Sequence, residues 1–245
     1  MDLPDEIIQL IISYLPETQT IKTIRLVSKR FKTLVNENHF WRLKCINLGL
    51  PLAEMAEGKD CIALYLTAKH GGNLLLNPNA AEKFSHWTIE LDGGDRFIIE
   101  DTPVGAKPFP TDLLKNRPVK TWVTSFATSS KYQFVDIHKN FEAYFYNKTK
   151  PKVCISEWYT SRFDCGCKYV ITVELLNKSK EILDTFQLID KLPPGHEWKQ
   201  VKHTFQKHYP TLQYIKYTHN GSDLNFWAGH YGAKFTGSSI RLVFS

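Results

Sequence analysis

The hydrophobic pattern of the chain changes its period near residue 73, and this change limits the possible folds more than any other feature. Before it, Ile7, Ile11 and Leu15 recur at helical spacing. After it, bulky and polar residues alternate, as in 168–175, and the alternation returns in 201–205 and 239–244. No strand is followed by a convincing long helix, which disfavours a parallel sheet. We therefore predict an α+β chain with a small all-α part and an antiparallel, jelly-roll-like β-sandwich.

The helical part is predicted to hold three short helices. Pro4 suits the first turn of the first helix, and Pro16 ends it. A second apolar stripe comprises Ile24, Val27, Phe31 and Leu34. Asn36 or Asn38 can cap a third helix that carries Phe40, Trp41 and Leu43. A unit of fewer than about 50 residues rarely buries enough surface alone, so we expect it to complete its core against a partner.

Glycine and proline residues divide the chain into three parts. We predict a helical domain over 1–48, a helical linker over 49–72 and a sandwich domain over 73–245. The linker contains an apolar stretch, Cys61–Lys69, that we expect to be a helix ended by glycines. Turn signals within the sandwich are Asp92–Asp95, Pro193–Gly195 and Asn220–Gly221.

Composition excludes several classes of protein. The net charge is +6, but the lysines are scattered, so we expect no nucleic-acid partner. We recognise no signal peptide and no apolar run of membrane-spanning length, so we expect a cytoplasmic protein without membrane insertion. The five cysteines are an odd number and fit a reducing compartment. Cys165 and Cys167 form a lone pair that cannot fill a zinc shell, so no metal or other cofactor is expected.

Two stretches near the N-terminus resemble an F-box. They are Leu3–Ile8 and Ile24–Phe31, followed in the usual order by Phe40-Trp41. Four later segments resemble the F-box-associated domain of the sugar-recognising F-box proteins: Asn73–Pro78 with Trp87, Glu157–Tyr159 leading to Asp164–Cys167, Trp198 with His203–Phe205, and Phe226–Ala233 with Ser238–Ile240. The resemblance implies a sandwich of two antiparallel sheets, galactose-binding-like in fold.

The first resemblance implies an adaptor partner that links the chain to a cullin–RING scaffold, making it a subunit of an SCF ubiquitin ligase. An apolar face suits such a partner, because the partner can remove water from it. The adaptor-binding residues so implied are Leu3, Pro4, Ile7, Ile8, Ile11, Val27, Phe31 and Trp41. The alternative is that these side chains pack against one another in the core of a three-helix unit, without a partner.

The second resemblance implies that sandwich loops bind the high-mannose N-glycan core of glycoprotein cargo. A flat aromatic ring covers the apolar face of a sugar, and fixed polar groups bind its hydroxyls. The matching positions are Phe126, Phe226, Trp227 and Ala228. The family's stronger binders carry Tyr-Trp-Lys where this chain has Phe-Trp-Ala. Trp227 can also be a core residue, and Asp164 either accepts hydroxyl bonds or caps the turn that follows it.

These patterns leave three hypotheses about function. The first is a non-catalytic SCF receptor that recruits misfolded N-glycoproteins in endoplasmic-reticulum-associated degradation (ERAD). The second keeps the ligase role but recognises a protein degron without lectin activity. The third is a glycan hydrolase using Glu157 or Asp164, since such chemistry needs two facing carboxylates.

Overall fold

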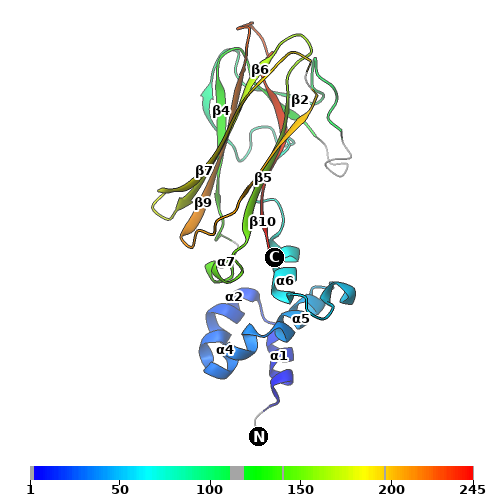
Figure 1. Ribbon diagram of the computed structural model, residues 1–245, viewed down its shortest axis with the longest axis vertical. Coiled ribbons are helices and arrows are strands. Elements are labelled where there is room, and N and C mark those ends of the chain that lie inside the picture. The colour runs from blue at the N-terminus through cyan, green and yellow to red at the C-terminus, as the bar shows by residue number, and fades with distance from the viewer. Residues whose placement is uncertain (1–2, 111–118, 140, 196, 245) are drawn as a thin grey trace. The chain divides into compact units, whose positions relative to one another are not determined.

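The computed structural model describes residues 3–110, 119–139, 141–195 and 197–244. The chain divides into two compact units (Figure 1). The helical unit comprises Met1–Gly72, Asn140–Lys152 and Leu242–Ser245, and the sandwich unit comprises Asn73–Lys139 and Val153–Arg241. The three-part division expected from the sequence stays a prediction. The structural units cut the chain differently, because the expected linker is part of the helical unit.

The helical unit contains α-helices with a short π-helical and a short 3₁₀ segment. Its α-helices are α1 (Asp5–Ser13), α2 (Glu17–Gln19), α3 (Arg25–Val27), α4 (Lys29–Asn36), α5 (Asn38–Asn47), α6 (Cys61–His70) and α7 (Ala143–Thr149). The π-helical segment is Thr20–Ile24 and the 3₁₀ segment is Leu52–Met55. No helix in the described ranges is both long and apolar enough to cross a membrane.

Local chemistry explains where several helices begin. Asp5 and Glu6 stand in the first turn of α1, where negative charge favours the positive end of the helix dipole. Ser28 caps α4 by accepting a hydrogen bond from the N–H of Phe31 at 3.2 Å. The cap predicted for α5 is wrong. Asn38 is the first residue of that helix, and its side chain instead donates to the carbonyl of Lys59 and accepts from the N–H of Cys61, the first residue of α6.

The core of the helical unit is completed by elements far from the N-terminus. Trp41 is only 1% exposed, and its indole N–H donates to the carbonyl of Val35 at 2.9 Å. Its ring centroid lies 5.3 Å from those of Phe40 on α5, Tyr65 on α6 and Phe145 on α7. The small N-terminal unit therefore gains core residues from its own chain. No clear pattern in the sequence indicates α7, whose seven residues form about two turns.

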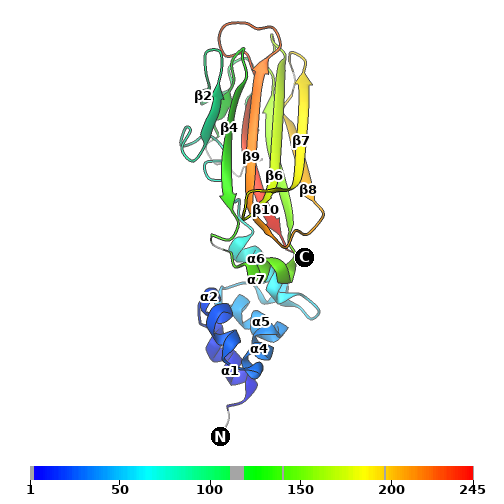
Figure 2. The ribbon, with the colours of Figure 1, turned by 90° about the vertical axis from the view of Figure 1, so that its left-hand side faces the viewer.

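The sandwich consists of two five-stranded sheets (Figures 1 and 2). The order of one sheet is β1-β4-β9-β6-β7 and that of the other is β2-β3-β10-β5-β8. The strands are β1 (Thr88–Asp92), β2 (Ile98–Glu100), β3 (Thr121–Val123), β4 (Ser129–Asp136), β5 (Lys152–Thr160), β6 (Cys167–Asn177), β7 (Ile182–Leu192), β8 (Lys199–Phe205), β9 (Leu212–Asp223) and β10 (Lys234–Val243).

The alternating pattern identifies the inner face of the first sheet correctly. Tyr169, Ile171, Val173 and Leu175 on β6 are all fully buried, as predicted. Residues two apart on a strand point to the same face, so these four side chains enter the space between the sheets. The turns predicted at Asp92–Asp95 and Pro193–Gly195 are also confirmed, since they connect β1 to β2 and β7 to β8.

The turn predicted at Asn220-Gly221 is wrong. Both residues lie within β9, where Asn220 pairs with Ser130 on one side and with Val170 on the other. Gly221 allows close packing at this point of the strand and does not form a turn. A Cβ added there would lie 2.8 Å from the Cβ of Ala233 and 2.9 Å from the carbonyl oxygen of Lys168. A glycine in a strand can mark such a close approach as well as a turn.

Candidate functional site

One end of the sandwich gathers loops from both sheets. The antiparallel pairings bring together the connections β1–β2, β3–β4, β5–β6, β7–β8 and β9–β10. The β9–β10 connection, residues 224–233, arches over this end (Figure 2). We call this set of connections the loop end. It carries all five residues that the sequence predicts for glycan binding.

The backbone of the β9–β10 loop is shaped by Asp223, the last residue of β9. Its carboxylate accepts hydrogen bonds from the backbone N–H groups of Asn225, Phe226 and Trp227. The side chain is buried, so these bonds are shielded from water. Phe226 adopts a left-handed φ of 57°, which is costly for a residue with a side chain. Asp223 therefore stabilises a strained turn that presents two large aromatic side chains.

The other half of the same loop is held by residues from two neighbouring connections. Ser125 donates from its hydroxyl to the carbonyl of Gly229 at 2.7 Å and accepts from the N–H of Asp95 at 2.9 Å. The Asp95 carboxylate in turn accepts from the N–H of Gly229. Gly229 has a φ of 109°, where a side chain would be strained. These hydrogen bonds anchor the middle of the β9–β10 loop.

The loop presents an exposed aromatic cluster. Phe226 is 73% exposed, and its ring meets that of Phe126 edge to face with centroids 4.9 Å apart. Trp227 is 45% exposed and meets Tyr231 at 90° with centroids 5.6 Å apart. Ala228, the next residue, is also exposed and brings no charge. Trp227 is therefore not a core tryptophan, unlike Trp87 and Trp122 in the interior.

Asp164 lies on the β5–β6 loop and is engaged by its neighbour Arg162. The guanidinium binds both carboxylate oxygens, at 2.9 and 3.0 Å. These hydrogen bonds hold the pKa of Asp164 below its ordinary value and raise that of Arg162. The Arg162 guanidinium carbon also lies 4.4 Å from the centroid of the Tyr231 ring. Asp164 is therefore connected to Trp227 through Arg162 and Tyr231.

The sequence did not single out Arg162, Tyr231 or Asp223 as site residues. Only Asp223 carries a local signal, because an aspartate often binds backbone N–H groups two or three residues further on. The role of Arg162 depends on contacts between separate loops, which spacing along the chain cannot reveal.

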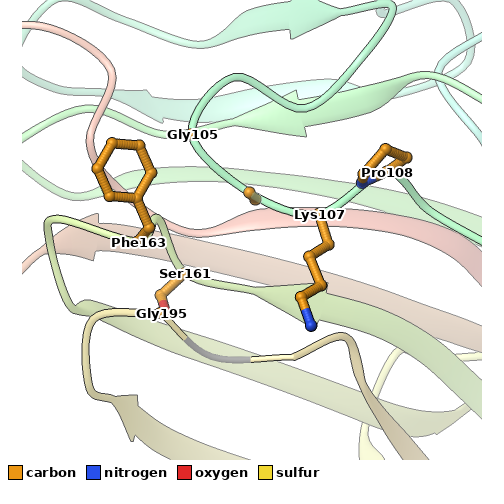
Figure 3. A pocket seen from close by; sticks show the side chains of 7 residues that line it. Gly105, Lys107, Pro108, Ser161, Phe163 and Gly195 are labelled. Carbon is orange, nitrogen blue, oxygen red and sulfur yellow. The ribbon is translucent and has the colours of Figure 1, made fainter.

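A cavity of about 410 Å³ opens between the β2–β3, β5–β6 and β7–β8 connections. Its lining includes Gly105, Lys107, Pro108, Ser161, Phe163 and Gly195 (Figure 3). The Lys107 ammonium pairs with Glu197, and the Ser161 hydroxyl donates to the carbonyl of Pro193 at 2.7 Å. Phe163 is largely exposed. The cavity and the aromatic cluster flank Arg162, whose neighbours in sequence line the cavity.

The geometry gives no support to hydrolysis at Glu157. That carboxylate is completely buried and accepts hydrogen bonds from His219, Ser238 and Tyr169. It cannot reach a sugar at the surface, and Asp164 is paired with Arg162. Among the described residues, no group of three or more histidines, cysteines or acids is placed to hold a metal ion.

The residues predicted to bind an adaptor fall into two groups. Leu3, Ile7 and Ile11 are exposed, as are Pro4 and Val27, whereas Phe31 is half-buried. Ile8 is 9% exposed and Trp41 belongs to the core, so neither offers much surface to a partner. Two further exposed side chains, Leu10 on α1 and Tyr14 at its C-cap, extend the stripe of Leu3, Ile7 and Ile11.

Comparison with known protein families assigns both parts of the chain. The F-box-like family model matches residues 1–47, and the F-box associated region (FBA) matches residues 65–242. The chain is therefore an F-box protein, a class that serves as substrate-recognition subunits of SCF ubiquitin ligases. More particularly, it belongs to the family of F-box proteins that carry the F-box associated region, as the resemblance of its sequence predicts.

Curated relatives share almost the whole chain. F-box only protein 44 of Homo sapiens is 33% identical over 98% of this chain and 95% of that protein. F-box only protein 6 of Homo sapiens is 31% identical over 98% of this chain and 82% of that protein. F-box only protein 2 of Bos taurus is 30% identical over the same shares.

Solved structures resemble the sandwich more distantly. TmCBM61 in complex with β-1,4-galactotriose is 15% identical with a TM-score of 0.43, covering 71% of this chain and 99% of that one. A CBM22-1 xylan-binding domain from Paenibacillus barcinonensis is also 15% identical, with a TM-score of 0.40, covering 72% and 97%.

Proposed function

We propose that this chain recruits misfolded N-glycoproteins to an SCF ligase by binding the inner part of a high-mannose glycan at the loop end. The observation that carries the proposal is the exposed Trp227 ring, held on a backbone that Asp223 fixes. A rigid, exposed aromatic ring is what a sugar's apolar face requires. Phe126 and Phe226 extend the aromatic surface beside it. Its cargo would be glycoproteins expelled from the endoplasmic reticulum, and its place of action the cytoplasm.

The helical unit supplies the second half of the proposal. The stripe formed by Leu3, just before α1, and by Ile7 and Ile11 on α1 is exposed and apolar, which favours a partner that removes water from it. We propose that the adaptor subunit covers this stripe together with Pro4, Val27 and the accessible part of Phe31. Through the adaptor, the chain would reach the cullin–RING scaffold. The chain itself would perform no bond chemistry and need no cofactor.

Two substitutions test the adaptor surface. Ile11→Asp places a charge in the exposed stripe and is expected to abolish copurification with the adaptor. Lys29→Asp, a charge change at an exposed position of α4, serves as the matched control and is expected to leave copurification intact. Equal capture of the Ile11→Asp variant and the parent protein would refute the proposed surface.

A glycoprotein capture experiment tests the choice of cargo. The full chain bound to its adaptor is incubated with a denatured high-mannose glycoprotein, before and after enzymatic removal of the glycan. Loss of capture after glycan removal supports a glycan receptor. Undiminished capture would refute that proposal and leave the SCF role in place.

The alternative function is recognition of a protein degron without lectin activity. Ala228 and Phe226 favour it, because the family's stronger glycan binders have lysine and tyrosine at these positions. Each lost hydrogen bond weakens binding by about 0.5–1.5 kcal/mol. Undiminished capture of the deglycosylated protein would be the result expected of this alternative.

A further inference from the structure

Arg162, on the β5–β6 connection, lies where the loop end meets the β2–β3 connection. It binds Asp164 within its own loop, and its guanidinium is 3.5 Å from the carbonyl oxygen of Val104 on the β2–β3 connection. Its own carbonyl accepts from the N–H of Gly195 at 2.7 Å. Its side chain is only 13% exposed. Arg162 is therefore positioned to organise the loops but has little surface to offer a ligand.

A chain of contacts leads from Arg162 to the exposed tryptophan. The guanidinium carbon lies 4.4 Å from the centroid of the Tyr231 ring, within the range of a cation–ring attraction. Tyr231 in turn meets Trp227 at 90° with ring centroids 5.6 Å apart, the edge-to-face arrangement that aromatic pairs favour. The tyrosine ring is thus held on one side by a cation and supports the tryptophan ring on another.

We propose that Arg162 is a positioning residue for glycan recognition: fixed by Asp164, it holds Tyr231 and thereby the ring of Trp227, without contacting the sugar. This inference rests on the proposed function, which supplies the ligand. It gives Asp164 a different role from the hydroxyl acceptor or turn cap expected from the sequence. Both oxygens of the carboxylate bind Arg162, so its principal task is to orient the guanidinium.

The neighbouring backbone leaves room for this arrangement. A Cβ added at Gly105 would lie 2.8 Å from the guanidinium carbon of Arg162. Gly105 also has a φ of 68°, so a side chain there would be strained as well as crowded. The β2–β3 connection therefore packs closely against the guanidinium at Gly105, and the Tyr231 ring lies against another part of the guanidinium.

The test compares four variants of the full chain bound to its adaptor. Arg162→Met keeps the length of the side chain and removes the cation, and it is expected to weaken chitobiose binding about fivefold, the size of one partly exposed cation–ring contact. Arg162→Lys keeps a cation and is expected to recover part of the affinity. Tyr231→Leu removes the ring and weakens binding, whereas Tyr231→Phe keeps the ring and the affinity.

A double substitution separates positioning from direct contact with the sugar. If Arg162 acts through Tyr231, adding Arg162→Met to Tyr231→Leu causes little further loss, because the ring through which it acts is already gone. Fully additive losses, or an Arg162→Met variant that binds as the parent does, would overturn the inference. Calorimetric titration with chitobiose gives the affinities.

A spectroscopic readout keeps the inference testable even if no glycan binds. The six tryptophans are replaced with 5-fluorotryptophan, and Trp227→Phe identifies the fluorine resonance of Trp227. Arg162→Met is expected to shift or broaden that resonance and to leave the resonances of Trp87 and Trp122 in place. An unchanged Trp227 resonance would overturn the inference. Failure of the parent protein to bind glycan would instead refute the proposed function alone.

Discussion

The interior of the sandwich and its loop end both combine a cation, a carboxylate and aromatic rings. In the interior, the Lys131 ammonium lies 3.6 Å from the centroid of the Trp87 ring and 3.3 Å from that of Trp122. It also contacts His219, which is hydrogen-bonded to Glu157. At the loop end, Arg162 binds Asp164 and faces Tyr231. The same kinds of side chain therefore form two clusters.

Burial gives the two clusters different consequences. Lys131, His219 and Glu157 are fully buried, and burial drives the pKa of Lys131 well below its ordinary value. Burial also lowers the pKa of His219 to about 4, so its ring is neutral near pH 7, with Nδ1–H donating to Glu157 and Nε2 accepting from Lys131. Burial alone would raise the pKa of Glu157, but its hydrogen-bond partners hold it below the ordinary value. The interior cluster lies within the core of the sandwich, whereas the loop-end cluster lies beside the exposed aromatic side chains Phe226 and Trp227.

The largest expected effect is on stability, from removal of the interior carboxylate. Glu157→Ala leaves the donors of His219, Ser238 and Tyr169 without their acceptor, and the free energy of unfolding is expected to fall by about 3–5 kcal/mol. Chemical denaturation measures it. Glu90→Ala, at an exposed site with a 3.9 Å ion pair, is the control and is expected to change it by less than about 1 kcal/mol. Similar losses of unfolding free energy in both variants would show that the buried and the exposed carboxylate contribute equally to stability, which would contradict this account.

The next-largest expected effect is a loss of stability on acidification, through the interior cluster. Between the ordinary histidine pKa of 6.5 and the folded value of about 4 for His219, the unfolded chain binds a proton that the folded chain does not. Stability therefore falls as pH drops through this window. The lowered pKa of Glu157 acts in the same direction at lower pH. Thermal unfolding at several pH values is expected to show a falling Tm, and a Tm that stays constant or rises between pH 6.5 and 4 would contradict it.

At the loop end, the expected effect is on binding and not on stability. Trp227→Ala removes the exposed ring and is expected to cost about 2 kcal/mol or more of binding free energy for chitobiose, the loss typical of a dominant contact residue. The Tm is expected to stay near that of the parent protein, because the ring is 45% exposed. Phe134→Ala, an exposed phenylalanine on β4, is the matched control and is expected to bind normally. A large fall in Tm for Trp227→Ala would place that ring among the stabilising residues.

The smallest expected effect is a gain. Ala228→Lys adds the cation found in the family's stronger binders and is expected to strengthen chitobiose binding by about 0.5–1.5 kcal/mol. Asn225→Lys places the same charge elsewhere on the exposed loop and serves as the control. Titrations of both variants at two salt concentrations measure the effect. Equal gains in both would show a general effect of charge and no specific contact at position 228.

The contrast also explains what the sequence could predict. Helical spacing and alternation identify α1 and β6 because each has one face turned to its core. The interior cluster has no such signal, since Lys131 breaks the expectation that a charged residue faces solvent. Likewise Asn220-Gly221 is a common turn pair, but here close packing against Ala233 requires the glycine within a strand.

For the loop end, the family resemblance named residues that the structure places at one end of the sandwich, but it did not predict the contacts between them. The rings of Phe126 and Phe226 are in contact, and their role in glycan binding stays a prediction. Asp164 was weighed as a hydroxyl acceptor or a turn cap, whereas its contacts are with Arg162. Contacts between loops that are far apart in sequence depend on the finished sandwich, so no local pattern predicts them.

Calorimetric titration of the full chain, bound to its adaptor, with chitobiose tests the central claim most directly. The parent protein is titrated beside Trp227→Ala, and cellobiose, which lacks the N-acetyl groups, serves as the control ligand. The account predicts millimolar or tighter binding of chitobiose by the parent protein and its loss in the variant, with no binding of cellobiose. Absence of chitobiose binding in the parent protein, or equal binding in both proteins, would contradict it.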